Sequence, residues 1–243
     1  MASKQVTDRQ KSSEVVQYAI SHQGTALQDA LAARSAAESG AAVDVSGLLT
    51  QLGSSLSGAT TAMIAADQTH EHELADDPAA RAARDEAAKG LYNEIVSARE
   101  ALVGVYGSAA VDALGFFGST SQDPVVLARQ GRSVVDRLRS GSLPTPRSVH
   151  LTLDVASLAS SLDPKVLAVE AALGTVNQEA REAQLTLVAK QRAIAEYDAT
   201  FRAVATTLEG LFSYAGLPEL AARVRPSRRS AGVTEEVAGG VSR

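Results

Sequence analysis

The sequence predicts an all-α protein, an elongated up-and-down helical bundle with a long C-terminal spine helix. Three observations lead to this class. Apolar residues recur every three or four positions through several long segments, which is helical spacing. Much of the apolar content is alanine, the strongest helix former. No segment alternates apolar and polar residues over enough positions to predict a strand.

The clearest predicted helix lies near the C-terminus. Its apolar stripe has thirteen positions between residues 173 and 215, and Lys190 alone among them is not apolar. Since no proline occurs between Lys165 and Leu217, the stripe predicts one helix over residues 163–216. At about 50 residues this helix would be roughly 75 Å long. A helix of that length needs other helices along its side, so we interpret it as a spine.

Lys190 lies where the character of this stripe changes. Residues 173–187 are rich in alanine and suit close packing against small-residue helices, whereas residues 194–212 suit a fuller core. One interpretation is that Lys190 fixes the register or oligomeric state of the seam. The other is that its aliphatic stem covers the seam while its ammonium reaches water.

Capping signals place the other helices in order along the chain. We expect helices from Ser12 or Ser13 to Glu38, after Asp44, and from Pro78 to about Tyr106. Shorter helical patterns follow at residues 109–114, 124–139, 147–160 and 219–224. The Asp-Pro pairs at 77–78, 123–124 and 163–164 are interpreted as three independent helix starts.

These elements divide the chain into four parts. Residues 1–106 form an N-terminal three-helix part of the bundle, and residues 107–162 form a compact insert of short helices. Residues 163–216 are the spine helix shared by both, and residues 217–243 are a flexible tail that contains arginine.

Composition excludes several classes of protein. A net charge of −5 argues against a general nucleic-acid binder. The absence of cysteine excludes disulfides, a thiol nucleophile and a cysteine-ligated metal. No apolar run is long enough for a membrane-spanning helix, and residues 1–13 lack the apolar core of a signal peptide. We expect a cytoplasmic protein with no cofactor, and export without a cleaved signal stays open.

Catalytic chemistry has little support in the sequence. A nucleophile elbow, a phosphate-binding loop and a dinucleotide fingerprint are all absent. Asp67, His70 and Glu71 would share one helix face and could hold a divalent metal. No Glu-x-x-His pair occurs, so a bundle di-iron site is not expected. The alternative is that His70 is a partly buried histidine near a helix end.

Two further segments suggest contacts with partners. Residues 101–118 are apolar apart from Asp112 and would suit a membrane-docking protein, unless Leu114, Phe116 and Phe117 plug the end of an alanine-rich bundle. In the tail, a basic patch is either a solvated segment or a contact for an anionic partner, membrane or nucleic acid, by charge alone. The patch consists of Arg223, Arg225, Arg228 and Arg229.

The sequence therefore favours a non-enzymatic structural or interaction protein that scaffolds partners or self-assembles through helix faces, in the manner of a coiled coil. Its partner would be a protein or a second copy of the chain, with no specific nucleic acid. The alternative is a membrane- or surface-active helical protein, of pore-forming or granule-coat type, acting through residues 101–118. A third hypothesis is a metal-binding helical-bundle enzyme. Candidate interaction residues are Phe116, Phe117, Lys190, Arg223, Arg225, Arg228 and Arg229, and candidate metal ligands are Asp67, His70 and Glu71.

Overall fold

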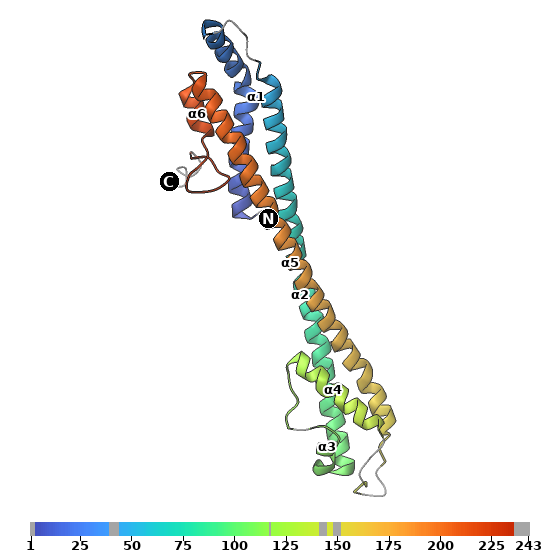
Figure 1. Ribbon diagram of the computed structural model, residues 1–243. Coiled ribbons are helices and arrows are strands. Elements are labelled where there is room, and N and C mark those ends of the chain that lie inside the picture. Colours follow the sequence, from blue (N-terminus) through green and yellow to red (C-terminus); the bar gives the residue numbers. More distant parts are fainter. Residues whose placement is uncertain (1–2, 39–43, 117, 141–144, 148–151, 236–243) are drawn as a thin grey trace. The chain divides into compact units, whose positions relative to one another are not determined.

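The computed structural model confirms the all-α class (Figure 1). It describes residues 3–38, 44–116, 118–140, 145–147 and 152–235. In these ranges none of the helices is long and apolar enough to cross a membrane. The helices are α1 (Lys4–Glu38), α2 (Ser46–Tyr106), α3 (Ser108–Ala113), α4 (Pro124–Arg139), α5 (Val155–Tyr214) and α6 (Pro218–Val224).

The long C-terminal helix is confirmed, but it begins earlier than predicted. α5 has 60 residues, so it is about 90 Å long. It starts after Asp154, whose carboxylate accepts a hydrogen bond from the Ser157 backbone at 3.1 Å. Pro164 therefore lies inside the helix, and the predicted start at residues 163–164 is wrong.

Asp163 has a different role from the cap that its Asp-Pro pattern suggested. Its two carboxylate oxygens accept ion-paired hydrogen bonds from Arg132 and Arg139 of α4, at 2.8 and 2.6 Å. Leu162 and Val166, on either side of Pro164, are fully buried in one core. An interior proline costs a helix about 3 kcal/mol, and burial on both sides of the proline offsets that cost here.

In α2, too, a predicted helix start lies inside a helix. The helices predicted after Asp44 and from Pro78 are one helix of 61 residues with Pro78 inside it. Asp77 does not start a new helix but pairs with Arg81, one turn ahead, at 2.6 Å. The side chains around Pro78 are exposed or half-buried, so core packing does not explain why α2 continues there.

The start of α1 also differs from the prediction. The helix begins at Lys4, and Ser12 and Ser13 lie inside it with buried side chains. The Ser13 hydroxyl lies 2.8 Å from that of Thr60 in α2, and Ser12 accepts a hydrogen bond from the Thr234 backbone at 3.2 Å. These serines resemble caps in sequence, yet they serve as polar contacts between elements. The expected stop at Gly40 lies outside the described residues.

Other capping signals are confirmed. Asp123 caps α4, with its carboxylate accepting from the backbone of Val125 and Val126 at 2.9 Å. Gly216 ends α5 with a φ of 78°, and Leu217 donates its N–H to the Phe212 carbonyl at 2.8 Å. This left-handed residue after the last turn is the usual glycine helix stop.

The chain forms two compact units whose boundaries differ from the four predicted parts. The first unit contains residues 1–72 and 183–243, and the second contains residues 73–182. Each of α2 and α5 contributes one segment to each unit.

The core of the first unit is made by α1, the first part of α2, the last part of α5 and α6. α5 provides its aromatic side chains, as the predicted fuller core requires, whereas no side chain at residues 173–187 is fully buried. That alanine-rich stretch therefore adds no fully buried side chain to either core. The largest buried side chains of this core are Leu27, Leu56, Met63, Tyr197, Phe201 and Phe212.

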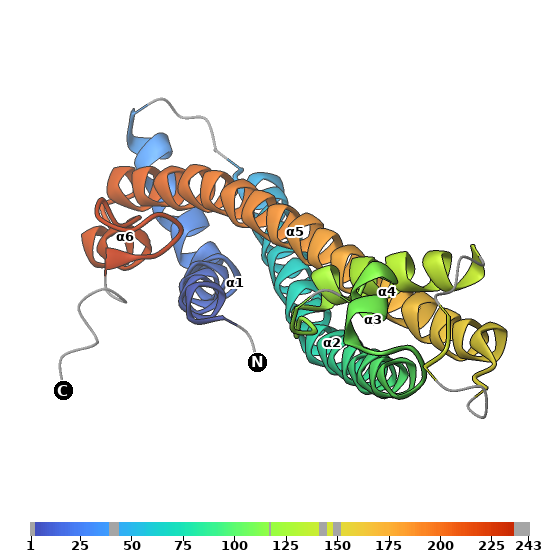
Figure 2. The ribbon, with the colours of Figure 1, turned by 90° about the horizontal axis from the view of Figure 1, so that it is seen from below.

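The second unit packs α3 and α4 against its segments of α2 and α5 (Figure 2). Gly131 of α4 is buried, and a methyl group there would lie 2.7 Å from Val166 of α5. Glycine thus permits a close approach between these helices. Phe116 follows α3 and is fully buried in this core.

The prediction of a flexible tail is wrong for residues 217–235. α6 contacts α1, and the chain after it returns to pair Pro226 with Thr234. Val233 and Thr234 are buried, and Tyr197 donates its single hydroxyl proton toward the carbonyls of Arg9 at 2.7 Å and Gly232 at 3.3 Å, which share it. The tail is therefore an integral part of the first unit up to Glu235, the last described residue.

Candidate interaction site

A buried ion pair joins two residues that the sequence singled out separately. The Lys190 ammonium lies 2.7 Å from Oδ1 of Asp67, whose side chain is fully buried. Ser3 donates two more hydrogen bonds to this carboxylate, from its hydroxyl at 2.9 Å and its backbone at 2.8 Å. Burial opposes ionisation of Asp67, but the bonds from Lys190 and Ser3 outweigh it and lower the pKa of the carboxyl.

This cluster bears on the two interpretations of Lys190. Its side chain is 13% exposed and its ammonium ends on Asp67. The pair connects α5 to α2, and Ser3 connects both to the start of α1. A buried charge pair is satisfied only when the helices are in register, so these contacts fit the register interpretation, which stays a prediction.

The same contacts do not support a metal at Asp67, His70 and Glu71. Both oxygens of Asp67 already accept hydrogen bonds, and an ammonium occupies the place a cation would take. Nδ1 of His70 lies 3.0 Å from the Thr186 hydroxyl, and the ring is buried. Because α2 continues to Tyr106, His70 does not lie near a helix end, and that part of the alternative interpretation is wrong. Glu71 is half-buried and has a partner of its own.

Three other carboxylates of the second unit lie close together. Ligand oxygens of Glu73, Glu179 and Glu182 fall within 4.8 Å of one another, the one such group among the described residues. Acidic side chains on neighbouring helix faces are often this close without a cation between them, so the group does not define a site.

The apolar segment at residues 101–118 is part of a core in this structure. Phe116 and Leu114 are buried with α2, α4 and α5, as the plug interpretation predicts. Phe117 lies outside the described residues. Because Phe116 is buried, its side chain is not on the surface, where a membrane contact would need it.

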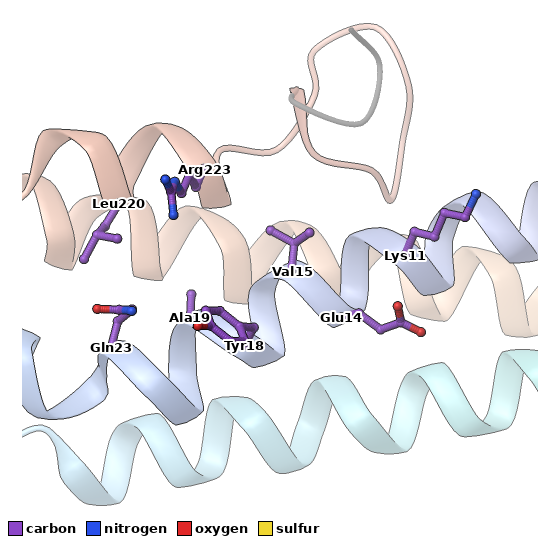
Figure 3. Close-up of a pocket in the computed structure, with 8 residues that line it drawn as sticks. All are labelled: Lys11, Glu14, Val15, Tyr18, Ala19, Gln23, Leu220 and Arg223. Atoms are coloured by element: carbon purple, nitrogen blue, oxygen red, sulfur yellow. The ribbon is translucent and has the colours of Figure 1, made fainter. Parts of the chain in front are cut away.

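A groove between α1 and α6 is the best candidate for binding (Figure 3). Its volume is about 670 Å³, and all of its lining residues belong to the first unit. Four apolar side chains and one amide meet three charged groups there. The lining consists of Lys11, Glu14, Val15, Tyr18, Ala19, Gln23, Leu220 and Arg223.

The groove has charged groups at one end and a third near the other. Figure 3 shows Lys11 and Glu14 at one end, Leu220 and Gln23 at the other, and Arg223 next to these, with Tyr18 between Lys11 and Arg223. The Tyr18 ring is 55% exposed and stacks on His22 with ring centroids 4.2 Å apart. Exposed aromatic side chains fixed by stacking are typical anchors in protein interfaces.

Sequence reasoning identified one residue of this groove, Arg223, and missed the rest. Tyr18 carries no signal in the sequence, because a single exposed aromatic residue on a helix is common and does not indicate binding by itself. Leu220 could not be placed, since its role depends on α6 folding against a helix about two hundred positions earlier in the chain.

Comparisons with known protein families, with curated proteins and with solved structures found no match to this chain.

Proposed function

We propose that this chain is a non-enzymatic interaction protein whose α1–α6 groove binds an amphipathic helix of a partner protein. The observation that carries the proposal is the groove itself, whose apolar side chains Val15, Tyr18 and Ala19 lie between Lys11 and Arg223. Helix-in-groove recognition uses this arrangement of one apolar face against another.

The size of the groove fits a short helix. Its α1 wall extends from Lys11 to Gln23, which is about 18 Å along the helix axis at the standard rise. A partner helix of about three turns would cover that length. Val15, Tyr18 and Leu220 would contact apolar side chains spaced three and four residues apart on the partner.

Charge indicates which partner helices fit best. Lys11 and Arg223 carry two positive charges toward opposite ends of the groove, against the single negative charge of Glu14. A partner with carboxylates before and after its apolar residues would pair with both cations. The whole chain is acidic, with a net charge of −5, so the groove differs locally from the chain as a whole.

A displayed library of random 16-residue peptides tests this proposal. Selection on the full chain should enrich peptides with apolar residues at helical spacing and Asp or Glu at their ends. Their binding should weaken about tenfold or more in Tyr18→Ser, because loss of an aromatic anchor typically costs over 1 kcal/mol. Leu185→Ser is the matched control, since Leu185 is 68% exposed in the same unit but outside the groove.

Three results would overturn the proposal. The first is a selection in which no peptide binds the wild-type chain more tightly than it binds the Tyr18→Ser variant. The second is that Leu185→Ser weakens peptide binding as much as Tyr18→Ser does. The third is selection of peptides that match a segment of this chain, which would replace a separate partner with a second copy. Arg223→Glu should reverse the preference for acidic ends if charge pairing operates as described.

A further inference from the structure

A second cavity in the first unit has a different chemistry from the groove. It lies between α5 and the chain that follows α6, and its volume is about 520 Å³. Three of its residues occupy one face of α5, spaced four and then three positions apart. The lining consists of Arg202, Thr206, Glu209, Arg225, Pro226, Ser227 and Arg228.

The loop that carries Arg228 is held in a defined place. Ser227 donates its N–H to the Val233 carbonyl at 2.8 Å, and Glu235 donates to the Arg225 carbonyl at 3.2 Å. The Ser227 hydroxyl oxygen accepts from the backbone of Arg229 and Ser230, each at 3.2 Å. These bonds close the loop at its base and at its tip, so Arg228 is presented by an ordered turn.

Hydrogen-bond donors exceed acceptors in this cavity. Nε of Arg225 binds Glu209 at 2.7 Å, which uses the one carboxylate of the lining. The guanidinium groups of Arg202 and Arg228 form no hydrogen bond or ion pair with any residue that the structure describes. The Thr206 hydroxyl and the Ser227 hydroxyl proton likewise have no acceptor within the described ranges.

We infer that this cavity binds the phosphate group of a soluble ligand, with Arg202 and Arg228 as its cationic donors. Two guanidinium groups and two hydroxyls offer more hydrogens than a carboxylate can accept, whereas a phosphate has three terminal oxygens and up to two negative charges. The Arg225–Glu209 pair lies between α5 and the loop and keeps the two walls together. The volume leaves room for the organic part of a phosphate ester beside the phosphate itself.

Titration of the isotope-labelled full chain with inorganic phosphate tests this site. The Nε–Hε signals of Arg202 and Arg228 should move saturably, and chloride at the same ionic strength should leave them in place. Arg202→Gln and Arg228→Gln should each weaken phosphate binding about tenfold or more, as expected for a charge-assisted hydrogen bond. Both residues are exposed, so these variants should melt at the wild-type temperature.

Arg229→Gln is the matched control, because Arg229 is exposed in the same loop but does not line the cavity. It should change phosphate affinity less than twofold. Equal weakening by Arg229→Gln would show attraction by net charge alone and would overturn the site, as would the absence of saturation. Succinate binding as tightly as phosphate would overturn the phosphate class. Binding to vesicles containing phosphatidic acid, with none to soluble glycerol 3-phosphate, would overturn the soluble ligand.

Discussion

Replacing Lys190 with methionine should destabilise the first unit by leaving a buried carboxylate without its counterion. Removal of one partner from a buried ion pair costs about 3–5 kcal/mol. The Lys190 side chain is 13% exposed, and Ser3 still donates two hydrogen bonds to Asp67 in the variant. We therefore expect Lys190→Met to lower the free energy of unfolding by about 3 kcal/mol, the lower end of that range.

A double-mutant cycle with Asp67→Leu separates the pair from its surroundings. The double variant Asp67→Leu/Lys190→Met should recover most of the loss, because well-packed apolar residues replace buried ion pairs at little cost. Hydrogen exchange by mass spectrometry is the suitable assay, since it reports on each of the two compact units by itself. Peptides around residue 190 report on the pair, and peptides from α4 provide an internal reference in the second unit.

The exposed pair Arg192–Glu196 is the matched control on the same helix. Its side chains are 80% and 61% exposed, so Arg192→Met should cost less than about 0.5 kcal/mol. The reasoning is refuted if Lys190→Met costs no more than Arg192→Met. It is also refuted if the two single losses simply add in the double variant.

The same carboxylate predicts how stability changes in acid. The folded-state pKa of Asp67 lies below its unfolded value, which is about 3.9 for an aspartate. Its contribution is therefore complete above that pH and is lost as pH falls toward the folded-state pKa. Between about pH 5 and pH 3, the wild type should lose more stability than Asp67→Asn. Parallel losses in urea melts of the two proteins would contradict this assignment.

Four substitutions test other parts of the fold. Gly131→Ala should cost the second unit about 1–3 kcal/mol by overpacking. Gly104→Ala, with open space around it, should stabilise the unit by about 0.5–1 kcal/mol in calorimetry. The reverse order of stabilities would contradict the close approach of α4. Gly232→Ala should cost about 1–3 kcal/mol, since its φ is 72° and a methyl group would collide with a carboxylate oxygen of α5. Exchange of the tail peptides should accelerate, and unchanged exchange would refute the contact. Pro78→Ala should stabilise α2 by up to about 3 kcal/mol, and a lower melting temperature would contradict an uninterrupted helix.

The apolar stripe of α5 was readable from sequence because it depends on local spacing alone. It placed Tyr197, Phe201 and Leu208 on one face, and all three are buried. The start of α5 was not readable, since an Asp-Pro pair has the same pattern whether it caps a helix or lies within one. The difference depends on Arg132 and Arg139, residues of a preceding helix that engage Asp163 only in the folded unit.

The candidate site also depends on contacts between residues far apart in the chain, which local patterns do not predict. Lys190 stood out as the single charged position of its stripe, and Asp67 as part of a polar cluster, but their pairing spans over a hundred positions of the chain. Helical spacing identifies which residues face inward on one helix and carries no information about which inward residues meet. The pairing had to come from the structure.

Two uncharged residues, Val233 and Thr234, hold the loop that carries the tail arginines in place. A flexible tail would attract any anion by net charge alone, so Arg228 and Arg229 would be equivalent. Val233 and Thr234 are buried within the first unit, and Thr234 donates its backbone N–H to the Ser12 hydroxyl, which holds the end of the loop against α1. Because the loop is fixed, Arg228 lines a cavity and Arg229 does not. The apolar end of the tail thus determines which arginine can recognise a ligand, and the two neighbouring side chains should differ in every assay that measures binding.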